Sequence, residues 1–392
     1  MLFQFWRCVM KRQGEFVNNL SGELSYKSFK PSDLPPNPNI EIDEDMLGLI
    51  SEASRILGKL DQKSDEIPNK ELYISMYIRK EALLSSQIEG TQATLDDIFD
   101  PNIGTNVNLE VTDVINYIKA SIYSNELIQT LPLSSRFLKN IHDVLLDGVR
   151  GEDKNLGEFR KTQNWIGPQG GSLKNAKFIP PNVSDMNDAM SKLENYIHYD
   201  ESNHLIKIAL AHYQFETIHP FLDGNGRVGR LLIGLMLKEY KLLKSDILYI
   251  SYYFKRNRIE YYDRLMDVRL KGHYEQWIKF FLNGIIEAGK NSLECINLLV
   301  SLNEKNAKLI DNKVSGSKKT ILEVFRYIQS NPIINITETS KKIGKAYNTT
   351  AAAIKKLQDL EILTIANEQD RNKVYIYEEY LAILREGTEL NT

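Results

Sequence analysis

The chain has 392 residues, of which 42% are hydrophobic and 26% are charged, and its formal net charge at pH 7 is −3. These values are typical of a soluble globular protein with two or three domains, and they exclude a disordered, collagen-like or coiled-coil chain. Because the net charge is near zero, the chain has no overall cationic field for nucleic acid or for an anionic membrane. Binding of that kind would need a local basic patch.

The sequence contains neither a dense cysteine pattern nor a membrane segment. Its two cysteines, Cys8 and Cys295, are too few for a disulfide scaffold or a thiolate metal site, which favours a reducing compartment. No apolar run approaches the roughly 20 residues needed to span a bilayer. Residues 1–10 lack the charged start, apolar core and cleavage site of a signal peptide. The sequence therefore predicts a cytoplasmic protein with no membrane partner.

Most of the chain has the apolar spacing of amphipathic helices, and a mainly α fold is predicted. Residues 30–39, KPSDLPPNPN, should form an extended loop, because proline fixes φ and disfavours a helical predecessor. In residues 157–181, short strand-like runs at 164–166 and 177–179 flank a stretch rich in Gly and Pro, which predicts an irregular β-hairpin. The predicted helices cover residues 46–60, 72–88, 114–128, 137–146, 186–197, 205–215, 228–240, 258–270 and 276–288.

A domain boundary is predicted in residues 303–317, where Asn, Lys, Asp, Ser and Gly crowd together. The elements predicted beyond it are helices at 320–329, 337–343 and 348–360, the last with Asn348 as N-cap, and strands at 362–366 and 374–377. This order predicts a winged helix-turn-helix. Residues 337–361 hold five lysines against three acidic residues, and the resulting local charge of +2 is weak for a DNA reader. Winged helices also serve in dimerisation and partner docking.

Residues 219–230, HPFLDGNGRVGR, combine several groups suited to phosphate chemistry. A helix starting near Arg227 would point its N–H groups into a loop whose glycines permit close approach of an anion. Arg227 and Arg230 share one helix face and can grip one polyphosphate. Asp223 is a candidate Mg²⁺ ligand, and His219 can accept a proton near neutral pH. A glycine-rich turn with a core histidine and surface arginines is the alternative, but eight specified positions in twelve residues weigh against it.

This segment resembles, at every defined position, the H-x-F-x-(D/E)-G-N-G-R-x-x-R motif of the Fic family of protein adenylyltransferases. The resemblance implies that His219 deprotonates a Ser, Thr or Tyr hydroxyl of a target protein. It also implies that Asp223 holds Mg²⁺ between the α- and β-phosphates of ATP. By position, the anion hole would be Gly224, Asn225 and Gly226, and the cations that neutralise the β- and γ-phosphates would be Arg227 and Arg230.

The resemblance also bears on the group transferred and on target docking. Relatives of the Doc toxin, which transfer the γ-phosphoryl group, carry Lys at the position of Gly226, so the glycine here favours AMP transfer. The surrounding predicted helices and the predicted hairpin at 157–181 resemble the Fic core and its target-docking flap. The resemblance covers roughly residues 30–290, and the rest of the chain only at the level of pattern.

A second motif, SSQIEG at residues 85–90, lies upstream. Ser85 and Glu89 share a helix face, and Gly90 is a natural left-handed stop. The Glu89 carboxylate would face the negative end of the helix dipole at a cost of about 0.3–1 kcal/mol, which a cation would offset. The pattern alone is weak, but its place before the core resembles the inhibitory helix of Fic proteins, whose Glu pairs with the second arginine of the motif. That arginine is Arg230 here, and the resemblance implies an enzyme inhibited within its own chain.

Four tyrosines that follow the motif are softer candidates. Tyr261 and Tyr262 are candidates to stack on adenine, as tyrosines after the motif do in the family. Tyr252 and Tyr253 are less favoured. Core or surface packing is the alternative for each of them.

These observations predict three domains: 1–110 with the inhibitory helix, 111–300 as the Fic core, and 301–392 as the winged helix. The predicted function is autoinhibited, Mg²⁺- and ATP-dependent transfer of AMP to a protein hydroxyl, with release of pyrophosphate. The alternatives are a hydrolase of the same fold that removes AMP, and a nucleotide-sensing DNA-binding regulator. A target protein is the predicted partner; self-modification and a homodimer stay open, and DNA binding is not favoured.

Overall fold

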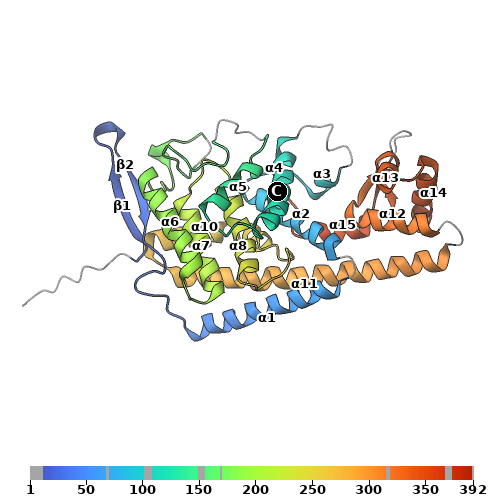
Figure 1. Cartoon of the computed structure of the whole chain (residues 1–392), viewed down its shortest axis with the longest axis horizontal. Coiled ribbons are helices and arrows are strands. Elements are labelled where there is room, and N and C mark those ends of the chain that lie inside the picture. The colour runs from blue at the N-terminus through green and yellow to red at the C-terminus, as the bar shows by residue number, and fades with distance from the viewer. Residues whose placement is uncertain are drawn as a thin grey trace, which may run out of the picture. The chain divides into compact units, whose positions relative to one another are not determined.

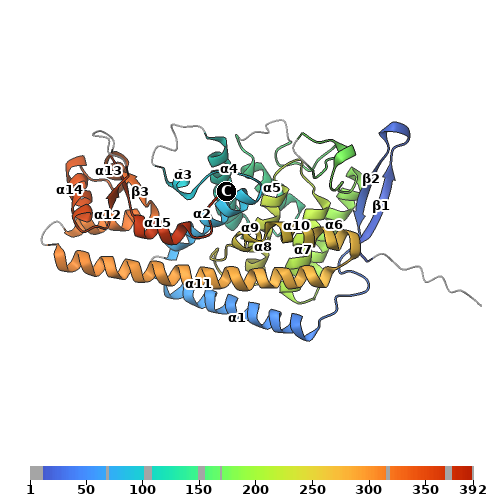
Figure 2. The same ribbon diagram turned by 180° about the vertical axis from the view of Figure 1, so that it is seen from behind.

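The computed structural model describes residues 12–67, 70–100, 108–148, 155–167, 170–314, 318–366 and 373–390, which are mainly helical (Figures 1 and 2). Contacts divide the chain into two compact units. Unit 1 comprises residues 1–55, 119–242 and 257–286, and unit 2 comprises residues 56–118, 243–256 and 287–392. The helices that belong partly to each are α1 (Glu44–Glu66), α4 (Leu109–Leu127) and α11 (Tyr274–Lys313). Within the described ranges, no helix has the length and apolar character needed to cross a membrane.

Unit 1 is built around α7 (His204–Ile218), in which every residue from Leu205 to Ile218 is buried. A helix that is buried on all sides belongs in the core of a domain. The helices around it are α5 (Ser135–Leu145), α6 (Val183–Tyr199), α8 (Asn225–Glu239) and α10 (Arg258–Lys271). The side chains of Ser134, Asn182 and Asn203 cap α5, α6 and α7, which fixes where these helices begin.

An antiparallel hairpin that the sequence did not predict precedes these helices (Figure 1). Its strands are β1 (Gly14–Asn19) and β2 (Tyr26–Pro31), paired in register from Gly14 opposite Pro31 to Asn19 opposite Tyr26. The strands are poor in β-branched residues, and their buried positions do not alternate regularly with exposed ones, so they give no periodic apolar signal. The predicted loop at 30–39 therefore begins at Ser32, and residues 32–39 contain no helix or strand.

The hairpin in residues 157–181 is irregular, as predicted. Its described residues contain one antiparallel bridge, between Ile166 and Phe178, and residues 168–169 lie outside the description. We call residues 164–179 the flap. Phe178 is buried, with its ring centroid 5.8 Å from that of Phe29 and the Arg269 guanidinium 4.0 Å above it. One side of the flap is thus anchored on β2 and α10, while Trp165 on the other run is 39% exposed.

Unit 2 contains two groups of elements. The first has α2 (Lys70–Ile88) packed against α9 (Ser251–Arg256) and the short α3 (Leu95–Phe99). The second consists of α12 (Lys318–Ser330), β3 (Ile333–Asn335), α13 (Ile336–Ile343), α14 (Tyr347–Asp359), β4 (Thr364–Ile365), β5 (Val374–Ile376) and α15 (Glu378–Arg385). The sheet order is β3-β5-β4, all antiparallel. Three helices followed by the β4–β5 pair keep the predicted order, and β3 and α15 are additions to it.

Two local predictions in this region are corrected by the structure. Ala346, not Asn348, is the N-cap of α14, and Asn348 is already inside the helix. Helix α11 continues to Lys313, so most of residues 303–317, where the composition predicted a domain boundary without apolar periodicity, is helical, while residues 315–317 lie outside the description. The polar run was misinterpreted because one face of it still packs: Asn306 and Ile310 are buried.

The α7–α8 contact yields a stability prediction. A Cβ added to Gly229 of α8 would overlap the Glu216 carboxylate and come within 3.1 Å of Phe215 Cδ1, both on α7. Gly229→Ala should therefore lower the free energy of unfolding by about 1–3 kcal/mol. Gly58→Ala, in open space on α1, should instead raise it by about 0.5–1 kcal/mol through helix propensity. Urea denaturation of both variants checks this, and equal stability of Gly229→Ala and wild type would contradict it.

Candidate functional site

The 219–230 motif is a loop between α7 and α8 of unit 1, and it begins with a strained residue. His219 closes α7 in the left-handed region, with φ 51° and ψ 61°, where non-glycine residues are uncommon. Gly224, with φ 74°, is the N-cap of α8, which begins at Asn225 rather than at the predicted residue 228. The first-turn N–H groups of any helix point out of its N-terminal end, here into the loop. Gly224 has no side chain to cap them, and this arrangement suits the binding of an anion.

Two side chains from outside the motif hold the main chain of this loop. Arg160 is 1% exposed, and its Nε donates to the His219 carbonyl at 3.0 Å while its backbone N–H donates to the Pro220 carbonyl at 2.9 Å. Asn164 Nδ2 donates to the carbonyls of His219 at 3.2 Å and Phe221 at 2.9 Å. Three consecutive carbonyls of the strained turn are thus satisfied, which offsets the cost of its conformation.

Arg160 also ties the turn to both ends of the flap. Its guanidinium donates to the carbonyl of Thr162, before the flap, and to that of Pro181, just after it. Burial lowers the pKa of Arg160 to about 10, so the group remains charged at neutral pH. One buried cation therefore couples the flap to the backbone of His219.

The ring of His219 has a defined tautomer. Its Nδ1 lies 3.3 Å from the Glu216 carbonyl, and because a carbonyl oxygen only accepts, Nδ1 carries the proton. The basic nitrogen is then Nε2. A general base needs one ring nitrogen oriented by the protein, and the bond at Nδ1 provides that orientation.

Asn225 acts through its side chain as well as its backbone. Its Oδ1 accepts from Phe221 N–H at 2.8 Å, and its Nδ2 donates to the Phe221 carbonyl at 2.8 Å. The buried amide therefore closes the loop on itself. Its role in shaping the loop adds to the anion-hole role that its position implies.

His142 of α5 supports the same loop from the other side. Its ring stacks on Phe221 with centroids 3.8 Å apart, its Nε2 donates to the Asp223 carbonyl at 3.1 Å, and its Nδ1 accepts from Gly157 N–H at 3.1 Å. Burial lowers its pKa to about 4. His142 is therefore neutral at physiological pH and holds the loop by hydrogen bonds.

Two arginines and one carboxylate have the disposition expected for phosphate and metal binding. Arg227 is 7% exposed and Arg230 is 2% exposed, three residues apart on α8. Asp223 Oδ1 accepts from Gly224 N–H at 2.7 Å and lies 3.9 Å from Arg227 NH2, with its side chain 40% exposed. A single, partly exposed carboxylate next to an anion site fits Mg²⁺, which typically takes one or two carboxylates plus phosphate oxygens and water.

Tyr261 and Tyr262 of α10 differ in environment. Tyr261 is 1% exposed, and its hydroxyl lies 2.9 Å from His212 Nε2. His212 Nδ1 donates to the Gly229 carbonyl at 2.9 Å, so Nε2 accepts from the tyrosine. Tyr262 is 36% exposed, with the Arg258 guanidinium 5.4 Å above its ring. Tyr262 is thus the one of the pair that offers a ring face towards solvent, while Tyr261 and His212 brace α8 from behind.

The predicted inhibitory residues belong to unit 2, and their pairing with Arg230 of unit 1 stays a prediction. Helix α2 ends at Ile88, and Gly90 has φ 103°, which favours glycine as expected. Ser85 is fully buried, whereas Glu89 is exposed in the turn that follows the helix. Tyr252 and Tyr253 also belong to unit 2, on α9.

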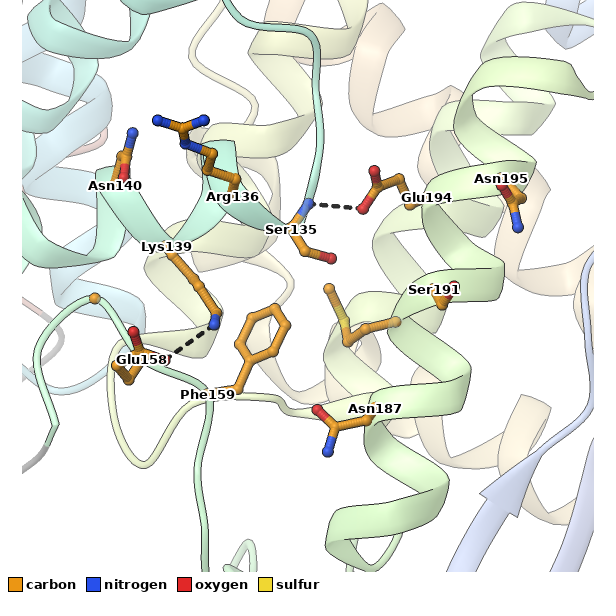
Figure 3. Close-up of a pocket in the computed structure, with 12 residues that line it drawn as sticks. Ser135, Arg136, Lys139, Asn140, Glu158, Phe159, Asn187, Ser191, Glu194 and Asn195 are labelled. Carbon is orange, nitrogen blue, oxygen red and sulfur yellow. Dashed lines mark hydrogen bonds and ion pairs between the residues drawn. The ribbon is translucent and has the colours of Figure 1, made fainter.

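A groove of about 580 Å³ lies beside the motif in unit 1, between α5, α6 and residues 157–159. Figure 3 shows the Lys139–Glu158 ion pair at 2.9 Å, the ring of Phe159 and the bond from Ser135 N–H to Glu194. The ring of Phe159 also meets that of Phe221 in the motif, at 5.2 Å. None of the residues predicted for the site lines this groove.

The supporting residues were missed because they act on main-chain atoms. Arg160, Asn164, His142 and His212 all bond backbone carbonyls that are distant in sequence, and such bonds select no recognisable partner type. His212 was visible only as a histidine on a helix before the motif. No spacing pattern in the chain singles out the other three.

The buried histidines make stability depend on pH. The pKa of His142 is about 4 and that of His212 about 3, because burial penalises the imidazolium, and Arg230 adds to the effect at His212. Unfolded histidine, with a pKa near 6.5, takes up protons first as the pH falls. The stability that these residues contribute is therefore complete above pH ~6.5 and is lost progressively below it.

His142→Gln should reduce this pH dependence. Between pH 7.5 and 5, the free energy of unfolding of this variant should fall by about 2 kcal/mol less than that of the wild type. Urea denaturation at the two pH values measures the difference. His273→Gln, at an exposed position, should keep the wild-type slope. Equal slopes for His142→Gln and the wild type would show that the imidazole is not held neutral.

Comparison with known proteins assigns the chain to a family. Residues 47–126 match the Fic/DOC family N-terminal model, and residues 132–237 match the Fic/DOC family model. The protein adenylyltransferase Fic of Drosophila mojavensis is 28% identical over 261 residues, 58% of this chain and 48% of that protein. That of Culex quinquefasciatus is 32% identical over 172 residues, 42% of this chain and 29% of that protein. The chain thus spans less than half the length of these curated relatives.

The fold agrees with this assignment. A crystal structure of a Fic family protein from Desulfovibrio desulfuricans G20 superposes with a TM-score of 0.55 at 18% identity, covering 86% of this chain and 97% of that one. Residues 47–126 and 132–237 thus match two Fic/DOC family models in succession, the second ending beyond the 219–230 motif, and the chain shares the fold of a Fic family protein.

Proposed function

We propose that this protein transfers AMP from ATP to a hydroxyl group of a target protein, releases pyrophosphate, and is restrained by its own Glu89. The observation that carries the proposal is the juxtaposition, in one loop and one helix, of an oriented imidazole and an anion-binding helix start with two buried arginines. The related proteins named as adenylyltransferases support the same reaction class.

In the proposed reaction His219 is the general base. Its Nε2 takes the proton of the incoming hydroxyl, and the oxygen attacks the α-phosphorus of ATP. The new bond forms between this oxygen and the α-phosphorus, and the bond from the α-phosphorus to the bridging oxygen of the β-phosphate breaks. Arg160 and Asn164 bond the carbonyl of His219, so the backbone that carries the imidazole is held in place before attack.

The leaving pyrophosphate would be stabilised by α8. The N–H groups of Asn225 and Gly226 and the side chains of Arg227 and Arg230 face or flank the loop where its negative charge develops. Asp223 would hold Mg²⁺, which when bound neutralises phosphate charge. Gly226 stands where Doc relatives have Lys, and the family resemblance then favours transfer of AMP over transfer of the γ-phosphoryl group.

Target docking is proposed at the flap. Ile166 and Phe178 already bond each other through N–H and carbonyl groups, and Trp165 offers an exposed aromatic ring beside them. An extended target segment could add to this edge by main-chain hydrogen bonds. Since Arg160 ties both flap ends to the His219 carbonyl, a docked segment would lie in register with the base.

His219→Ala should abolish AMP transfer while ATP binding persists, because the base acts on the incoming hydroxyl and contributes little to holding phosphates. A loss of at least about a hundredfold in AMP incorporation is expected. Label from α-³²P-ATP and intact mass measure the transfer, and calorimetry measures ATP binding. His273→Ala, at an exposed histidine, should behave like the wild type. Parallel loss of nucleotide affinity and activity in His219→Ala would count against the role of base.

The proposed restraint is tested by Glu89→Gly. If Glu89 engages Arg230, its removal should let the arginine clamp the γ-phosphate, and adenylylation of the protein itself or of added targets should rise at least several-fold. Arg230→Ala in that background should cancel the gain, because both changes act through one contact. Unchanged labelling by a folded Glu89→Gly variant would remove the inhibitory assignment. Removal of AMP from a modified protein by the wild type would favour the reverse reaction.

A further inference from the structure

The turn that carries Glu89 is fastened to a distant part of the same unit. Gln87, within the 85–90 motif, is 8% exposed, and its Nε2 donates to the carbonyl of Ala93 and to that of Thr388, both at 3.0 Å. The second bond joins residues 301 positions apart in the sequence. One amide thus fixes the chain on either side of Gly90 and attaches it to residues 386–389, which follow α15.

Residues 386–389 pack against α9 and bond to it. Lys255 of α9 is 7% exposed, and its Nζ donates to the carbonyls of Gly387 and Glu389. Gly387 has φ 78°, and a Cβ added there would overlap the ring of Tyr252. Thr388 is 5% exposed. Residues 386–389 are therefore both closely packed and hydrogen-bonded through their main chain.

A third connection lies just beyond the turn. Arg385, the last residue of α15, forms a two-pronged ion pair with Asp96 of α3, from Nε to Oδ1 and from NH2 to Oδ2, each at 2.8 Å. Helix α3 is itself fixed by Thr94 and Asp97, which form a capping box. The whole stretch from Gln87 to Asp97 is thus held at both ends by residues 385–388.

We propose that residues 385–389 form a latch that holds the Glu89 turn in its inhibitory position, so that the strength of autoinhibition is set from the winged-helix end of the chain. This inference rests on the proposed function. The bonds of Gln87 and Asp96 to residues 385–388 all lie within unit 2. Any event that pulls residues 385–389 away, such as a partner binding to α15, would loosen the turn and raise AMP transfer.

Two variants of the full chain test the latch. Gly387→Ala places a Cβ against the ring of Tyr252, and Arg385→Asp reverses the charge that pairs with Asp96. Each should raise AMP incorporation roughly three- to tenfold, below the level of Glu89→Gly, as expected for the loss of one hydrogen-bonded contact. Amide hydrogen exchange of residues 88–93 should accelerate in both variants. Adding Asp96→Arg to Arg385→Asp should restore both the low labelling and the protection, because the pair is re-formed with reversed charges.

Glu378→Gln is the matched control, since it removes the other carboxylate that Arg385 contacts and leaves Asp96 in place. Its AMP incorporation and the amide hydrogen exchange of its residues 88–93 should equal those of the wild type. If Glu89→Gly raises AMP incorporation but Gly387→Ala and Arg385→Asp leave it at the wild-type level, the latch is wrong and the proposed function stands. If Glu89→Gly does not raise AMP incorporation either, the proposed restraint by Glu89 is wrong. Amide hydrogen exchange of residues 88–93 then still decides whether residues 385–389 hold the turn. Should Gly387→Ala not fold, the charge-reversal pair gives the same decision.

Discussion

The left-handed backbone of His219 is the constraint on which the rest of unit 1 depends. A histidine at φ 51° is stable only if its neighbours bind the carbonyls that the turn exposes, and Arg160 and Asn164 supply those bonds. The bend of the chain at this residue ends α7, and α8 starts six residues later with its N–H groups facing the loop. The strain is thus local, but its compensation draws in the flap and β2.

The site separates reacting groups from groups that hold them. Two groups of the motif with a proposed chemical role, Asp223 and the ring of His219, are partly exposed, whereas the two arginines of the motif are buried. Groups that hold the motif, such as Arg160, His142 and His212, are buried and bond to main-chain carbonyls. Burial keeps both supporting histidines neutral, so they add no charge that would compete with the arginines for phosphate.

The sequence predicted the helices and the chemical groups, but not the groups that position them. Apolar spacing located α10 well because its buried residues repeat at helical intervals, and it located α7 because that helix is apolar enough to be buried on all sides. The start of α8 was placed three residues late, because glycines carry no helix signal even where the backbone is helical. The sequence did not predict the β1–β2 hairpin because its strands have few β-branched residues and no regular apolar alternation. The N-cap prediction at Asn348 was wrong because a cap and a first-turn polar residue look alike in sequence.

The glycine at position 229 shows how a fold can constrain a site that its chemistry leaves unspecified. The family motif accepts any residue there, yet the space beside Gly229 is filled by Glu216 and Phe215 of α7. A relative with a larger residue at this position must have a shorter one opposite it, or its two helices must separate. Positions 229 and 216 should therefore covary among homologous sequences. Such covariation would reflect helix packing within a motif that is usually defined by its catalytic residues.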